Sequence, residues 1–197
     1  MIVLRIVLLS LVALLAACTK PAIWAPDEEV AAARYVHPGP PSITLFNVIS
    51  NETGTGAHAA LMINASQRVL FDPAGSWQHP QSPEQHDVHY GFDDRQLFRF
   101  IYFHARRTHH VRKQYLELPA QHAEMILQLA RQAGPVADGF CARSIGEILR
   151  QVPGLESVPV AFMPNRLSDG FARIPGVQEE LIYSDAEPTE RQSYAEG

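Results

Sequence analysis

Three residues of this chain, His58, Asp72 and Cys141, have the side chains that a nucleophilic thiol site requires. An imidazole held by a carboxylate can accept a proton, and it then needs a nearby hydroxyl or thiol to act on. His58 lies at the start of the apolar stretch 57–63, and Asp72 directly follows the stretch 68–71. We therefore predict a Cys-His-Asp site, provided that the fold brings these segments together.

Residues 57–63 and 68–71 are predicted to be the two strands of a hairpin. Both are short apolar runs, and the polar residues 64–67 between them are typical of a turn. A tight antiparallel hairpin returns the chain to its starting point, so residues at its two open ends become neighbours. His58 and Asp72 occupy those ends, and we expect their side chains to meet.

Cys141 is predicted to lie in the first turn of a helix. Asp138 and Gly139 precede it as the expected cap and turn residues, and a Pro-Gly pair at 153–154 ends the helical pattern. Unpaired backbone N–H groups and the dipole at a helix start lower the pKa of a thiol and can hold an oxyanion. The alternative is that Cys141 is a small hydrophobic residue of the core. The predicted buried stripe of the helix consists of Ile145, Ile148, Leu149 and Val152.

The remaining pattern predicts an α+β fold. Strands are expected over residues 42–50, 97–103, 114–118 and 158–163, where β-branched and other apolar residues are frequent. Residues 119–133 are expected to form a helix, with proline in the first turn and a Gly-Pro pair after the end. We therefore expect an antiparallel β-sheet packed against helices.

A cluster of four positive charges lies between two of the predicted strands, in residues 105–113. The charges are interpreted as the solvated tip of a hairpin, and the alternative is a binding site for an anionic ligand or a lipid head group. They belong to Arg106, Arg107, Arg112 and Lys113.

The long polar segment 76–94 is predicted to be a surface loop, and it holds His79, His86 and His89. A metal site is the alternative for these histidines. Their spacing is not that of a helical HxxxH pair, however, and no acid or cysteine is fixed beside them. We expect neither a metal nor another cofactor.

The N-terminal residues 1–17 have the pattern of a secretory signal, because one positive charge is followed by an apolar run and then by small residues. Residues 15–18, Leu-Ala-Ala-Cys, resemble a bacterial lipobox, the motif of lipoprotein signal peptides, which implies that Cys18 is lipidated. The alternative is a plain transmembrane anchor, but the run is short for a hydrocarbon core of about 30 Å. Thr19 follows the cysteine, and by resemblance to Gram-negative sorting rules this implies the periplasmic face of the outer membrane.

The order of His58, Asp72 and Cys141, on a strand, a strand end and a helix start, resembles the circularly permuted papain-like hydrolases. This group includes the NlpC-type peptidoglycan peptidases and the lecithin-retinol acyltransferase-like proteins, and the adenovirus-protease and SUMO-protease groups share the order. The segments that carry the resemblance are GAHAALMI, VLFDPAGSW and LPAQHAEMILQLARQAGPVADGFCARSIGEIL. The resemblance implies that Asp72 orients His58, that His58 takes the proton of Cys141, and that the thiolate attacks an amide or ester carbonyl.

The chain departs from this group next to the predicted nucleophile. Many relatives have Asn directly before the cysteine, where this chain has Phe140. No Gln stands a few residues ahead of Cys141, as it does in the viral and SUMO proteases. The backbone N–H of Cys141 is therefore one expected oxyanion donor, and the second donor is unassigned.

Four parts of the chain are expected. They are a lipoprotein signal peptide at 1–17, a tether at 18–41 with a short helix within 27–34, a papain-like domain at 42–165 and a polar tail at 166–197. The 197-residue chain has a net charge of −5, and this mild negative charge argues against nucleic acid as a partner. With Cys18 lipidated, Cys141 has no partner for an intramolecular disulfide.

Together these features predict a cell-envelope lipoprotein that is held to the membrane through Cys18 and carries a thiol hydrolase site. The resemblance implies peptide amides of peptidoglycan as the substrate, or else lipid acyl esters. The alternative is a lipid-anchored binding or scaffold module that keeps the papain-like shape without catalysis.

Overall fold

A seven-stranded sheet in the order β4-β5-β3-β2-β1-β6-β7 forms the centre of the molecule, and all of its neighbouring strands are antiparallel. The computed structural model describes residues 23–185. The strands are β1 (Ser42–Ser50), β2 (Gly56–Asn64), β3 (Arg68–Phe71), β4 (Glu84–Gln85), β5 (Val88–His89), β6 (His109–Glu117) and β7 (Gln178–Ile182). The helices are α2 (Asp27–Ala32), α3 (Asp94–His104), α4 (Ala120–Ala133), α5 (Cys141–Leu149) and α6 (Pro164–Phe171). The predicted α+β class, with an antiparallel sheet packed against helices, is confirmed.

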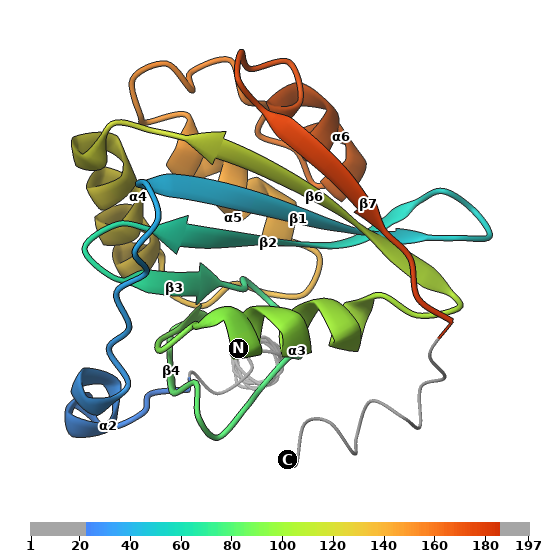
Figure 1. Ribbon diagram of the computed structural model, residues 1–197. Coiled ribbons are helices and arrows are strands. Elements are labelled where there is room, and N and C mark those ends of the chain that lie inside the picture. The colour runs from blue at the N-terminus through green and yellow to red at the C-terminus, as the bar shows by residue number, and fades with distance from the viewer. Residues whose placement is uncertain (1–22, 186–197) are drawn as a thin grey trace, which may run out of the picture.

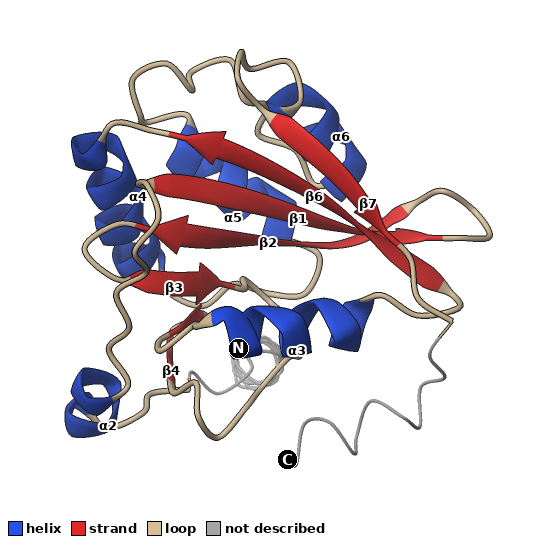
Figure 2. Ribbon diagram, in the orientation of Figure 1, coloured by secondary structure: helices blue, strands red, loops and turns tan. Residues whose placement is uncertain are grey.

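The sheet has a hydrophobic core on each face, because side chains alternate between the two faces along each strand. On one face, Ile43 and Leu45 of β1 belong to a core that includes buried residues of α4, α5 and α6. On the other face, Phe46 and Val48 of the same strand pack in a core with Phe100 of α3. Figures 1 and 2 show α5 behind the sheet and α3 in front of it.

The predicted hairpin, the predicted strand 42–50 and the predicted helix 119–133 are all present. β1 pairs with β2 on one side and with β6 on the other along its length. α4 follows Pro119 and ends at Gly134, whose φ of 71° is unfavourable for residues with a side chain. Its buried residues recur at helical spacing: Ala123, Ile126, Leu127 and Ala130.

The prediction of a strand over residues 97–103 is wrong, because these residues form most of α3. Asp93 caps this helix, and its side chain accepts a hydrogen bond of 2.8 Å from the backbone N–H of Gln96. The buried residues Gln96, Phe100 and His104 recur at every fourth position, which is a helical period. The β-propensity of the phenylalanines in this segment is therefore overridden by the cap and the period.

The predicted hairpin tip at residues 105–113 is confirmed only in part. Arg106 and His109 form an antiparallel bridge around a tight turn that contains the exposed Arg107, but β6 already begins at His109. Arg112 and Lys113 lie inside β6, where they form ion pairs with acidic residues of α6 and β7. Arg112 pairs with Asp169 at 2.6 Å and with Glu179 at 2.7 Å, and Lys113 pairs with Glu180 at 3.0 Å. These two charges are therefore neutralised within the fold.

The C-terminal part of the described chain belongs to the sheet. Residues 166–182, which we expected in a polar tail, form most of α6 and the edge strand β7, while residues 158–163 form no strand. β7 is the polar sequence QEELI, and four of its five residues are exposed. An exposed edge strand lacks the alternation that marks a strand with one buried face, so its sequence resembles that of a tail.

The segment that was expected to be a tether lies against the sheet as far as it is described. It contains α2, within the predicted short helix, and Trp24 forms a β-bridge with Gln85. The backbone N–H of Arg68 in β3 donates a hydrogen bond of 2.9 Å to the carbonyl of Tyr35. The predicted signal peptide and Cys18 lie outside the described residues. Within residues 23–185, none of the helices has the length and apolar character needed to cross a membrane.

Candidate active site

His58, Asp72 and Cys141 lie together in the structure. The Nε2 atom of His58 is 2.6 Å from the Oδ1 atom of Asp72, and the Cys141 thiol interacts with the same ring through a hydrogen bond. Because Asp72 occupies Nε2, the nitrogen that is left for the thiol is Nδ1. The imidazole thus connects a carboxylate to a thiol, as the sequence predicts.

The short length of β3 makes this meeting possible. β3 pairs with β2 only from Leu61 to Asn64, so the earlier part of β2, including His58, continues past the end of β3. Asp72 follows the last residue of β3 and lies diagonally across from His58. With no strand on the β3 side of it there, β2 is accessible to the start of α5, and the backbone N–H of Ala59 bonds to the Cys141 sulfur.

A β-bulge precedes His58 in β2. His58 is opposite Val48 of β1, whereas Ile49 is opposite Gly56, so Ala57 has no partner across the ladder. A bulge adds one residue to one strand and changes the direction of the side chains around it. This extra residue therefore sets which face of the sheet the imidazole occupies.

A tight turn fixes Asp72. The backbone N–H of Gly75 donates a hydrogen bond of 2.9 Å to the Asp72 carbonyl, and Ala74 in the turn has a φ of 56°. A Cβ atom at Gly75 would collide with the Asp72 carboxylate. Glycine at position 75 is therefore what allows the turn to close tightly around this acid.

Cys141 is the first residue of α5, as the sequence predicts. The expected cap, Asp138, does not occupy the N-cap position, which belongs to Phe140 and carries no side-chain cap bond. The backbone N–H of Ala142 bonds to the sulfur, as does that of Ala59. Cys141 is also 5% exposed and belongs to the core cluster on this face, so the burial expected of a core cysteine is found together with the imidazole contact.

The electrostatics favour a charged triad. Burial opposes the charge on His58, but Asp72 and Cys141 outweigh it and raise the pKa of the ring from 6.5 to about 10. Burial likewise opposes the charges on Asp72 and Cys141, but His58 lowers the pKa of both. At neutral pH the site therefore favours an imidazolium between a carboxylate and a thiolate.

A further histidine, His104 at the end of α3, stacks on His58. The two ring centres are 5.7 Å apart, with an angle of 14° between the planes, and Nδ1 of His104 is 2.9 Å from the carbonyl of Phe100. The charges of His104 and of His89 also lower the pKa of Asp72, after the larger effects of burial and of His58. Sequence reasoning missed the role of His104 because its segment was predicted to be a strand.

A pocket of about 290 Å³ lies beside His58, and His104, Gly75 and Ser76 also line it. Cys141 does not line this pocket, which therefore gives access to the imidazole rather than to the sulfur. Two exposed aromatic rings lie near the start of α5, one of them on Phe140, which directly precedes Cys141. Phe140 is 39% exposed and Phe162 is 53% exposed, and their ring centres are 5.2 Å apart.

The histidines of segment 76–94 contact aromatic rings. His79 stacks on Trp77, the edge of His89 meets the same ring, and His86 packs against Trp24. The segment is less exposed than we expected, because it contains β4 and β5, and His89 is 2% exposed. Among residues 23–185 no group of three His, Cys, Asp or Glu side chains is arranged to hold a metal ion.

Comparisons of this chain with protein-family models, with curated proteins and with solved structures found no match.

Proposed function

We propose that this protein is a thiol hydrolase in which Cys141 attacks the carbonyl carbon of an amide or an ester. The observation that carries the proposal is the position of His58, which lies 2.6 Å from the buried carboxylate of Asp72 and also contacts the thiol. A carboxylate held against an imidazole beside a thiol is the arrangement that generates a nucleophilic thiolate.

In the first half of the reaction, the thiolate forms a C–S bond to the carbonyl carbon, and the carbonyl π electrons move to the oxygen. The backbone N–H of Cys141, at the start of α5, has no partner within the helix and donates to this oxyanion. The oxyanion then collapses, the imidazolium of His58 gives its proton to the leaving amine or alcohol, and the bond to that group breaks.

In the second half, neutral His58 takes a proton from water, and the resulting hydroxide attacks the thioacyl carbon. The C–S bond breaks, the carboxylic acid product leaves, and Cys141 returns as the thiolate beside the imidazolium. Asp72 keeps the ring in one orientation and stabilises its positive charge in both halves.

We further propose that the fold is a circularly permuted papain-like architecture on a bacterial cell-envelope lipoprotein. The chain order of His58 on β2, Asp72 after β3 and Cys141 at the start of α5 supports the architecture. The lipobox-like residues 15–18 support an anchor at Cys18 and the periplasmic face of the outer membrane. The resemblance favours peptidoglycan peptides as substrates over lipid acyl esters.

A second candidate function is that of a lipid-anchored binding or scaffold module without turnover. The observation that favours it is the burial of Cys141, which is 5% exposed and does not line the pocket beside His58. An active thiol has to become accessible to a carbonyl carbon, whereas a scaffold does not.

The two candidates are distinguished by trapping the thioacyl intermediate. Full-length protein in a mild non-ionic detergent is mixed with p-nitrophenyl acetate, and the burst of nitrophenol and the mass of the peptide that contains Cys141 are measured. A hydrolase should give a burst, an acetyl group on Cys141 and its slow release. His58→Ala should abolish the burst, and the surface control His122→Ala should retain it. An equal burst in His58→Ala would refute the proposed base.

A further inference from the structure

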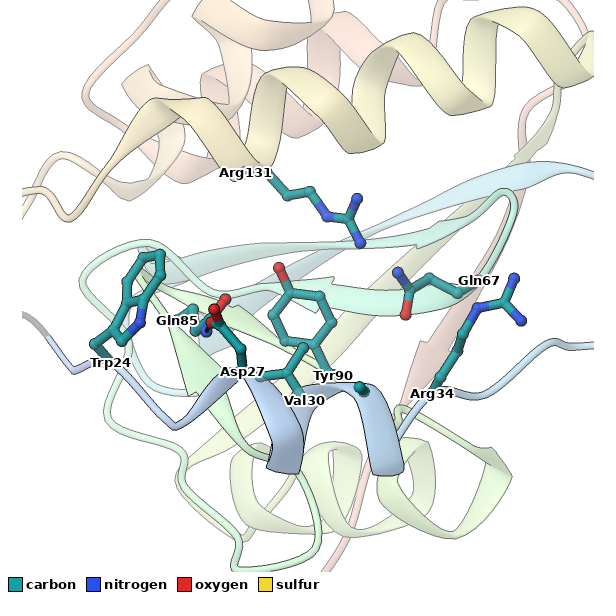
Figure 3. Close-up of a pocket in the computed structure, with 9 residues that line it drawn as sticks. Trp24, Asp27, Val30, Arg34, Gln67, Gln85, Tyr90 and Arg131 are labelled. Carbon is teal, nitrogen blue, oxygen red and sulfur yellow. Dashed lines mark hydrogen bonds between the residues drawn. The ribbon is translucent and has the colours of Figure 1, made fainter.

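A second cavity, of about 440 Å³, lies where α2 and α4 meet the edge of the sheet at β3 to β5, and none of His58, Asp72 and Cys141 lines it. Its volume is within the range of about 300–1,000 Å³ that is usual for small-molecule sites. Figure 3 shows that side chains from α4, from the β2–β3 turn and from the segment after β5 enter it from different sides.

Three polar side chains converge at one end of this cavity. Arg131 reaches down from α4, and its guanidinium carbon is 5.6 Å from the centre of the Tyr90 ring, as Figure 3 illustrates. Tyr90 is 4% exposed and Gln67 is 8% exposed. Within residues 23–185, the buried Nε of Arg131 has no hydrogen-bond partner. Buried polar groups normally have partners, so this donor lacks an acceptor.

The charges around this end favour an anion. Arg34 lies at the rim, and its Nη2 donates a hydrogen bond of 2.9 Å to the carbonyl of Ser66. Glu124 of α4 attracts the charge of Arg131, but its carboxylate also accepts hydrogen bonds from the Ser66 backbone N–H and from Gln128. Asp27, the one acid in the lining, is bonded to Gln85 at 2.8 Å. Two arginines thus line the cavity, and the one acid among its lining residues is already bonded to Gln85.

We propose that this cavity binds a small anionic ligand, with a carboxylate or phosphate group held by Arg131, Tyr90 and Gln67. All three side chains can donate to such an oxygen, and a planar guanidinium matches the geometry of either group. The apolar part of the ligand lies along Val30 and Trp24, which line the remainder of the cavity. This site is separate from the candidate active site and does not depend on the proposed hydrolase.

The test is a ¹H–¹⁵N NMR titration of the full-length protein in non-ionic detergent. Benzoate and phenyl phosphate are the anionic probes, and benzamide is the neutral probe of the same shape. The side-chain amide signal of Gln67 and the Nε–H signal of Arg131 should shift in a saturable manner with an anionic probe. Benzamide should bind at least about tenfold more weakly, since it lacks the charge that pairs with Arg131. The tighter of the two anions identifies the ligand as a carboxylate or a phosphate.

Arg131→Gln should weaken binding of the anionic probe at least about tenfold, whereas Arg150→Gln, an exposed arginine after α5, should leave it unchanged. Should Arg131→Gln fail to fold, Tyr90→Phe, which keeps the ring and removes only the hydroxyl, should weaken binding about threefold to tenfold. Equal binding of benzamide and the anions would overturn the proposal. So would undiminished binding in the variants, or no shift with either anion at about 10 mM.

Discussion

Replacement of Asp72 by Asn should move the reactivity of Cys141 toward higher pH. Asp72 gives the largest of the effects that raise the pKa of His58, and this pKa rises from 6.5 to about 10. Since one pH unit corresponds to about 1.4 kcal/mol, the site stabilises the charged ring by roughly 5 kcal/mol, shared between Asp72 and Cys141. Without the carboxylate, the neutral ring no longer stabilises the thiolate.

The expected magnitude follows from the fraction of thiolate. In the wild-type protein the Cys141 pKa lies below its ordinary value because of His58, despite burial. In Asp72→Asn it should rise to at least about 8.5, the value of a free thiol, which leaves about 0.3% thiolate at pH 6. A thiol of higher pKa is intrinsically more nucleophilic, which offsets part of this loss. We therefore expect alkylation at pH 6 to slow at least about tenfold.

The assay is the rate of iodoacetamide addition to Cys141 in the full-length protein between pH 5 and pH 10, followed by mass spectrometry. The matched control is Asp185→Asn, which makes the same change on an exposed residue far along the chain. Asp72→Asn should shift the midpoint of the profile upward, and the control should leave it in place. A wild-type midpoint near that of free cysteine, or an identical midpoint in Asp72→Asn, would refute the proposed ion pair.

Three further results are expected. Gly75→Ala should lower the free energy of unfolding by about 1–3 kcal/mol, because the added methyl group collides with the Asp72 carboxylate. Urea unfolding measures this change, with the neighbouring Ser76→Ala as the control. Equal midpoints in the two variants would contradict the prediction. Cys141→Ala should reveal the titration of His58, whose pKa Asp72 still raises in the variant. The stability that this raised pKa gives is complete below pH 6.5 and is lost as pH rises through it. In the wild-type protein the lowered Cys141 pKa offsets this loss up to about pH 9. Unfolding at pH 6 and pH 9 should therefore differ more in the variant than in the wild type, and parallel curves would exclude the coupling. Arg112→Ala should cost about 0.5–1 kcal/mol by the same urea assay, because it removes the ion pairs with the partly exposed Asp169 and Glu179. This loss should diminish in high salt, and an equal loss at low and high salt would contradict an electrostatic origin.

The parts of the site that depend on neighbouring residues could be predicted from the sequence. The meeting of His58 with Asp72 follows from one hairpin, whose strands and turn are visible in the pattern of apolar and polar residues. The position of Cys141 at a helix start follows from the helical spacing after it. Both are short-range features, for which hydrophobic periodicity is informative.

The role of His104 could not be predicted, because it depended on α3. The segment that contains Phe98, Phe100 and Phe103 has the composition of a strand, and only the cap at Asp93 and the spacing of the buried residues indicate a helix. With residues 97–103 assigned to a strand, His104 had no predicted place beside His58.

The approach of Cys141 to the hairpin could not be derived from the sequence pattern either. It requires β3 to stop after four residues, so that the start of α5 reaches Ala59. Nothing in the sequence of residues 68–71 indicates that β3 ends after four residues. Its early end arises from packing between segments about seventy residues apart in the chain. β7 was missed for a different reason, since its exposed polar residues carry no alternation.

The β-bulge at Ala57 has a consequence for how this protein tolerates change. It lies between the loop 51–55 and His58, at the point where the pairing of β1 with β2 shifts by one residue. In a strand without a bulge, a one-residue insertion or deletion would shift the pairing register along the strand, and every following side chain would turn to the opposite face. Here the bulge at Ala57 can gain or lose a residue without a shift in the rest of β2. The adjacent loop is therefore free to vary in length while the His58 imidazole keeps its orientation.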